Sequence, residues 1–256
     1  MRQQAIQAGV SAPTMVRLAR VLGFADYASL RRPFREAIAG GSVFGRRASA
    51  LQSTPAASRT GKLARKIVDA QIGDVQSVQV LNKPAAITAT AEAIARARRV
   101  GFLGVRASFS IAFYFRYAYS LIATNGVLFD GLGGFLLDQA EALERGDVLV
   151  AVSQLPYSAP TVLAVEAARQ RGVKIIAFSD SAMSPLARRA DHTLLFGTES
   201  LSFFPSMIAP LALVELLLAQ LAARGGKKVL NRLAEVERRL AASHAYWRET
   251  GYRARA

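Results

Sequence analysis

The sequence has no cysteine and only two histidines among its 256 residues. Without thiols the chain can form neither a disulfide framework nor a thiolate metal site. The two histidines lie far apart in the sequence, which argues against a zinc site as well. This composition fits a reducing compartment, so we expect a cytoplasmic protein that holds no metal and no cofactor.

A signal peptide and a convincing membrane span are also missing. The first ten residues lack the apolar stretch of a signal peptide. The most membrane-like run, residues 201–223, contains two prolines, a glutamate and a glutamine, which favours a buried or interface helix over a transmembrane one. With 52% hydrophobic and 20% charged residues, the chain is predicted to be globular and not to bind a membrane.

Acidic residues are scarce at both ends of the chain. Residues 1–66 carry twelve Lys or Arg against two acids, and residues 224–256 carry nine against three. The middle, residues 67–223, carries twelve against thirteen, so the formal net charge of +15 belongs to the ends. A cationic end on a neutral body is typical of an appendage that binds a polyanion, although a solvated surface would have the same composition.

The first forty residues have the spacing of a helix-turn-helix. In AIQAGVSAPTMVRLARVLGF, Ala5 is small enough for two helices to cross, Gly9 allows the turn, and Val10, Met15 and Leu18 supply apolar contacts. The residues expected to face DNA lie on the second helix or at its leading end: Ser11, which also caps that helix, Pro13, Thr14, Arg17 and Arg20. Only a stub, residues 2–8, precedes the turn. We therefore expect the domain to be incomplete at its N-terminus.

Composition divides the chain into three parts. Residues 1–40 form the predicted DNA-binding domain. Residues 41–61 are rich in Gly, Ser, Ala, Thr and Arg, which predicts a linker. Residues 62–256 form the body, which opens with helical patterns at 62–81 and 85–98.

The body alternates strand and helix patterns. Strands are predicted at 100–104, 127–129, 148–152, 173–178 and 193–196, and helices lie between them. Such alternation indicates an α/β fold with a doubly wound, parallel five-stranded sheet, whose ligands bind at the carboxyl ends of the strands.

Two turns at that edge are rich in hydroxyl groups. The central strand 148–152 runs into SQLPYSAPT, and a helix is predicted to start near Pro160. Its positive end would be ringed by Ser153, Tyr157, Ser158 and Thr161. The turn after the first strand brings Ser108 or Ser110 to a second helix start, with Arg106 as the nearby cation. Two such turns indicate a phosphate site, although one alone could be an ordinary capped turn.

Groups that could act as a catalytic base are few. Glu199, just past the fifth strand, is the one acid placed to serve as a base or to accept a sugar hydroxyl. His192 is better explained as a structural residue at a strand start, and His244 lies in the basic tail. No P-loop or dinucleotide fingerprint occurs. We therefore assign no catalytic residue and expect the protein not to be an enzyme.

Together these motifs resemble the RpiR family of bacterial transcriptional regulators. The landmarks are AGVSAPTMVRLARVLGF, GVRASFSIA, DVLVAVSQLPYSAPTV and FSDSAMSPLARRAD, in that order. The resemblance implies a helix-turn-helix followed by a sugar isomerase (SIS) domain that senses phosphosugars. It also implies phosphosugar contacts at the serines 108 or 110 and at Ser153, Ser158 and Thr161. The sequence LPYSAPT replaces the SGET-type loop of SIS isomerases.

The resulting hypothesis is a regulator that binds a DNA operator and responds to a phosphosugar effector. An isomerase-like enzyme and a phosphosugar-binding fragment that does not bind DNA remain as alternatives. The apolar runs 111–123 and 203–222 exceed what a small sheet needs to cover one face. We therefore expect a homodimer or a homotetramer.

Overall fold

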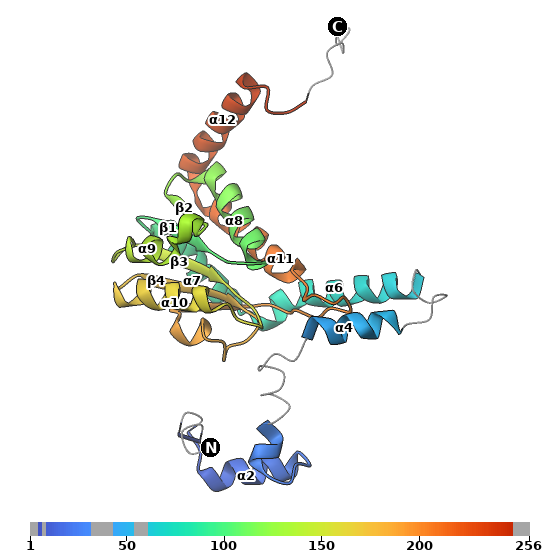
Figure 1. The fold of residues 1–256 in the computed structure, drawn as a ribbon. Coiled ribbons are helices and arrows are strands. Elements are labelled where there is room, and N and C mark those ends of the chain that lie inside the picture. The colour runs from blue at the N-terminus through green and yellow to red at the C-terminus, as the bar shows by residue number, and fades with distance from the viewer. Residues whose placement is uncertain (1–4, 7–8, 32–42, 54–60, 248–256) are drawn as a thin grey trace. The chain divides into compact units, whose positions relative to one another are not determined.

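The computed structural model describes residues 5–6, 9–31, 43–53 and 61–247 (Figure 1). The chain forms two compact units. The first unit comprises Met1–Gly61 together with Leu201–Phe204, and the second comprises Lys62–Ser200 and Pro205–Ala256.

In the first unit, a turn leads into helix α2 (Ala12–Val21). Gly9 adopts a left-handed conformation with φ +64°, and the Ser11 hydroxyl caps α2 by accepting the Thr14 N–H at 3.3 Å. The buried apolar positions described here are alanines, Ala5 and Ala19, together with Leu30. Leu18, expected to pack between the helices, is 46% exposed, because Ala19 occupies the inward position of α2.

Helix α4 (Val43–Gln52) also belongs to the first unit. It lies inside the stretch that composition assigns to a linker, residues 41–61. Phe44 of α4 stacks on Phe204, with ring centroids 5.3 Å apart. An aromatic partner so distant in the sequence explains why local composition gives no sign of this helix.

The second unit is built on a five-stranded parallel sheet with the order β2-β1-β3-β4-β5. Its strands are β1 (Val100–Leu103), β2 (Gly126–Phe129), β3 (Val148–Val152), β4 (Lys174–Ser179) and β5 (His192–Leu195). The predicted α/β fold is confirmed, and each strand end lies within one residue of its predicted position.

Helices cover both faces of this sheet (Figure 1). The elements are α6 (Gly61–Leu81), α7 (Pro84–Arg96), α8 (Ser108–Ile122), α9 (Leu136–Glu141), α10 (Ala159–Gln170), α11 (Ile208–Arg224) and α12 (Gly226–Ala242). Alternate residues of β3 face opposite cores: Val150 packs in a core with α7, α8 and α11, whereas Leu149 packs in a core with α9 and α10. Burial on both faces explains the continuous apolar sequence of this strand.

Among the described residues, no single helix is long and apolar enough to cross a membrane. Helices α11 and α12 pass that test only as a pair, by length and composition, and they are bent by 111° at the break between them.

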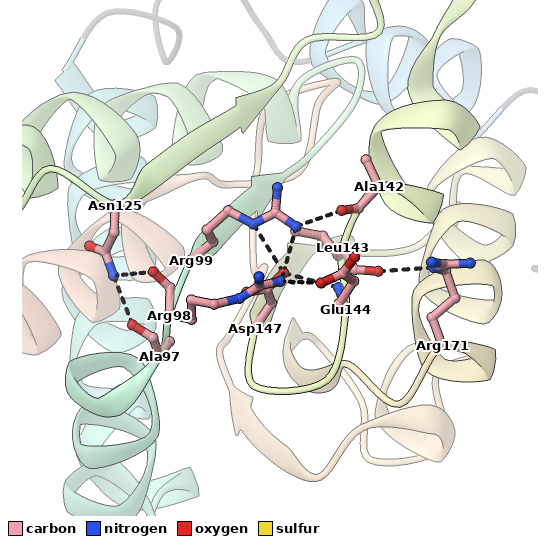
Figure 2. Close-up of polar contacts among 9 residues, drawn as sticks. All are labelled: Ala97, Arg98, Arg99, Asn125, Ala142, Leu143, Glu144, Asp147 and Arg171. Atoms are coloured by element: carbon pink, nitrogen blue, oxygen red, sulfur yellow. Dashed lines mark hydrogen bonds and ion pairs between the residues drawn. The ribbon is translucent and has the colours of Figure 1, made fainter.

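A buried carboxylate joins the amino ends of β1 and β3 (Figure 2). The Asp147 side chain is fully buried and pairs with Arg98 at 3.0 Å and with Arg99 at 2.9 Å. It also accepts the Glu144 N–H at 2.9 Å. Burial by itself would raise the pKa of Asp147, but the hydrogen bonds from Arg98, Glu144 and Arg99 outweigh it and hold that pKa below its usual value. This cluster stabilises the edge opposite the predicted ligand site.

Candidate functional site

The strand order reverses between β1 and β3, which makes the carboxyl ends of these strands a topological switch point. After β1 the chain enters α8 on one face of the sheet, and after β3 it enters α10 on the other. The two connections therefore diverge, and in open α/β sheets such a switch point is where ligands generally bind. Both hydroxyl-rich turns lie at this point.

The turn between β1 and α8 is tightly packed. A Cβ atom at Gly104 would lie 2.4 Å from the Ser108 carbonyl oxygen, so only glycine fits. Ser108 is buried at the start of α8. The Ser110 hydroxyl is exposed and donates to the Ala107 carbonyl at 2.8 Å. Arg106 is exposed and has a left-handed backbone, with φ +56°.

The turn between β3 and α10 holds three of the predicted residues. Ser153 is buried, and its hydroxyl accepts the Ser158 N–H at 3.4 Å. Ser158 is the N-cap residue of α10, but its side chain makes no capping hydrogen bond. Thr161 is completely buried, and its hydroxyl has no partner among the described residues. The structure therefore brings Ser153, Ser158 and Thr161 together at the start of one helix, as predicted.

Tyr157, which was predicted to line the phosphate site, makes a hydrogen bond to the end of another strand. Its hydroxyl donates to Asp180, just past β4, at 2.9 Å, and the second carboxylate oxygen accepts the Leu155 N–H at 3.2 Å. Burial and the neighbouring Asp180 charge raise the pKa of Tyr157. The tyrosine thus fastens this turn to the end of β4. The Asp180 carboxylate places a negative charge at this end of the turn.

Gln154 is a further candidate site residue, which the sequence patterns did not predict. It follows Ser153 directly and is buried, yet its Oε1 atom has no partner among the described residues. Its Nε2 atom lies 3.3 Å from Met207 Sδ, a weak acceptor. The sequence contained one signal, because an amide directly after a buried strand is placed at the ligand edge.

The two candidate bases lie at opposite edges of the sheet. Glu199 is exposed beyond the carboxyl end of β5, and its backbone N–H donates to Asp74 at 2.9 Å. His192 begins β5 at the amino edge, where burial and the nearby Lys174 lower its pKa. Within the part of the chain that the structure describes, no group of three His, Cys, Asp or Glu residues could hold a metal ion.

The residues predicted to contact DNA lie on one short segment of the first unit. Ser11, Pro13, Arg17 and Arg20 are exposed, and Thr14 is partly buried beside the cap. The first turn of α2 contains no acidic residue. Because Arg17 and Arg20 are exposed, their guanidinium groups are accessible to an anionic partner.

Comparison with known proteins shows which family has this architecture. The SIS domain family matches residues 93–220, half of the chain. The sugar isomerase domain of an RpiR transcription factor from Sphaerobacter thermophilus is 31% identical, with a TM-score of 0.66, over 69% of this chain and 99% of that one. The chain belongs to the RpiR family. This confirms the resemblance seen in the sequence motifs.

Three further proteins are similar to this chain. The NanR protein of Vibrio vulnificus, complexed with ManNAc-6P, has a TM-score of 0.65 at 20% identity, over 94% of this chain and 85% of that one; this likeness concerns the fold alone. The regulator HexR of Pseudomonas aeruginosa is 28% identical over 71% of this chain and 61% of its own length. An uncharacterized HTH-type regulator from Caldanaerobacter subterraneus is 30% identical over 55% of this chain and 51% of its own. The chain thus spans less than two thirds of these curated relatives.

Proposed function

We propose that this chain is a transcriptional regulator whose SIS domain binds a phosphorylated sugar or sugar acid and whose helix-turn-helix binds a DNA operator. One observation carries the proposal for the ligand. Gln154 and Thr161, from the same turn at the switch point, each bury a polar atom that has no partner among the described residues. Such atoms destabilise a fold by about 1–3 kcal/mol each unless something bonds to them.

The chemistry of this edge fits a phosphate ester. Ser108 and Ser153 offer hydroxyl donors, and the amino-terminal ends of α8 and α10 add positive dipole ends. The unpaired Gln154 Oε1 atom is an acceptor, so it fits a sugar hydroxyl, which can donate to it, better than an ionised phosphate oxygen. The ligand of the NanR complex, ManNAc-6P, belongs to this chemical class.

The same edge supplies little for proton transfer. Isomerisation of a sugar needs a base held at the bound carbon atoms. Glu199 is exposed to solvent, and His192 lies at the other edge. We therefore favour a sensor over an isomerase. Incubation with aldose and ketose phosphates, followed by NMR, should show no interconversion, and turnover would reverse this choice.

A double variant tests the pocket. Ser153→Ala with Ser158→Ala should weaken binding of a phosphosugar at least 10-fold by calorimetry, because a bond to a charged group contributes about 1.5–3 kcal/mol. Ser120→Ala with Ser243→Ala is the control and should bind like the parent, because Ser120 lies near the far end of α8 and Ser243 is the C-cap residue of α12. ManNAc-6P and a panel of hexose and pentose phosphates serve as ligands, with the unphosphorylated sugars as negative controls.

Two results would contradict the pocket assignment. If the parent binds no phosphorylated sugar or sugar acid, the sensor function is wrong. If the double variant binds as well as the parent, the sensor remains but the phosphate does not lie at the β3 turn.

We also propose that the protein is a homodimer. The outer face of α8 carries Phe109, Phe113 and Tyr117 one turn apart, and the last two are 52% and 53% exposed. Such an aromatic stripe is costly to leave in water. Light scattering at micromolar concentration should give at least twice the monomer mass, and a monomer would exclude this assembly.

A further inference from the structure

Helix α6 and Asn82, the residue that follows it, hold the chain that leaves β5 through a series of polar side chains. Asn82 pairs with both backbone groups of Leu195, at 2.7 Å each. The Ser77 hydroxyl accepts the Gly197 N–H at 2.8 Å, and Asp74 accepts the Glu199 N–H at 2.9 Å. The bonded positions are alternate residues of an extended segment, so α6 acts as a pairing partner for this edge of the sheet.

The contact is close and is made by buried groups. Asp74 is only 2% exposed. A Cβ atom at Gly197 would lie 2.7 Å from the Asp74 carboxylate and 3.0 Å from the Ser77 hydroxyl, so the backbone fits there only because the residue is glycine. The second Asp74 oxygen has no partner in the described part of the chain.

The same segment continues into the first unit. Residues Leu201–Phe204 cluster with Met1–Gly61, although the residues on either side of them belong to the second unit. Within the first unit Phe204 stacks on Phe44 of α4. Helix α6 is itself the direct continuation of the first unit, because it begins at Gly61. The chain from Gly197 to Phe204 therefore connects the ligand edge of the sheet with the DNA-binding unit.

We propose that Asp74 and Ser77 are positioning residues that hold the segment 197–199, and that this segment transmits effector binding to the first unit through Phe204. An effector at the carboxyl edge of the sheet lies at the same edge as this segment, whose backbone is fixed at Glu199 by Asp74. Any shift there acts on α6 and on the Phe204–Phe44 stack together. The identity of the effector rests on the proposed function, whereas the link between Asp74 and α4 does not.

Hydrogen exchange of the full chain tests the link without any ligand. Asp74→Ala and, separately, Ser77→Ala should speed amide exchange about fivefold or more in residues 197–200, the effect of losing one hydrogen bond of about 1 kcal/mol. Exchange in residues 43–53 should rise as well. Asp69→Ala, an exposed aspartate five residues earlier on the same helix, is the matched control and should change neither segment. Unchanged exchange in residues 43–53 for both variants would overturn the proposal.

A second experiment adds the ligand. ManNAc-6P is the probe, followed by other hexose phosphates if it does not bind. Binding should alter exchange in residues 43–53 of the parent, and Phe204→Ala should abolish that response while calorimetry shows the parent's affinity. A response that persists in Phe204→Ala would refute the route through Phe204. If no phosphosugar binds the parent, the proposed function fails, and the ligand-free experiment still decides the link.

Discussion

At Gly104 the end of β1 and the first turn of α8 come so close that no side chain fits. The predicted phosphate donors of Ser108 and its turn depend on that approach. A Cβ atom there would meet backbone rather than a flexible side chain, so the turn itself would have to move.

Gly104→Ala should therefore weaken phosphosugar binding at least 10-fold and lower the melting temperature. Gly73→Ala is the control, because nothing lies within 4 Å of its added Cβ and it sits inside α6. There alanine should stabilise the protein by about 0.5–1 kcal/mol. Thermal unfolding and calorimetry on both variants check this, and equal behaviour of the two glycines would contradict the packing argument.

The sequence predicted which residues gather at the candidate site better than it predicted what each of them contacts. Ser153, Ser158 and Thr161 were found because hydroxyl groups cluster after a buried strand. The unpaired atoms of Gln154 and Thr161 could not be predicted, since they depend on which groups fold around them. The hydrogen bond from Tyr157 to Asp180 could not be predicted either, because these residues come together only when β3 and β4 pair.

Among the elements, the amino ends of β1 and β3 are held by a single carboxylate. Asp147 is buried, but its partners Arg98 and Arg99 are 52% and 37% exposed. Asp147→Asn should destabilise the protein by about 3 kcal/mol, near the lower end for breaking a buried pair, because the guanidinium groups keep part of their hydration. Glu144→Gln, which removes an exposed partner of Arg98, should cost less than about 1 kcal/mol.

The Asp147 contribution should also depend on pH. Its pKa is lower in the folded protein than in the unfolded chain, where an aspartate titrates near about 3.9. The stabilisation is therefore complete above the unfolded pKa and is lost as the pH falls through the folded pKa. Urea unfolding between about pH 6 and pH 2.5 should show the gap between parent and Asp147→Asn closing at the acid end. A constant gap would exclude this linkage.

Strands were predicted more accurately than the helices that flank the domain. Burial on both faces produces unbroken apolar runs such as 148–152, which can be recognised locally. Helix α4 has a mixed sequence and an aromatic partner, Phe204, that follows it by 160 positions. Asn82 and Asp74 bond to Leu195 and Glu199, which follow them by 113 and 125 residues. No local sequence pattern can predict contacts at that separation.

For the whole molecule, the charge is distributed as a DNA-binding regulator would need it. Residues 1–66 carry twelve basic side chains against two acids, while residues 67–223 are nearly neutral. This cationic N-terminal part contains helix α2, the proposed recognition helix, and the nearly neutral part holds the sheet. Because counterion release scales with phosphate contacts, we expect DNA affinity to fall steeply with salt.

Arg17 and Arg20 provide the sharpest test of DNA binding. They lie one turn apart on α2 and are both exposed, which is the arrangement needed to reach base edges in the major groove. Arg17→Ala or Arg20→Ala should weaken binding by about 1–3 kcal/mol where the lost contact is bidentate to a base, and should relax sequence preference at that position. Fluorescence anisotropy on a fragment that the parent protein has selected from genomic DNA measures both effects.

Arg238→Ala on α12 is the matched control, because it removes the same charge from an exposed site in the second unit. A loss as large as that for Arg17 or Arg20 would mean that only net charge matters. Parental affinity in both α2 variants would remove the recognition-helix assignment. A selective loss confined to α2, together with a weaker preference for the selected sequence, is the outcome that direct reading of bases by this helix requires.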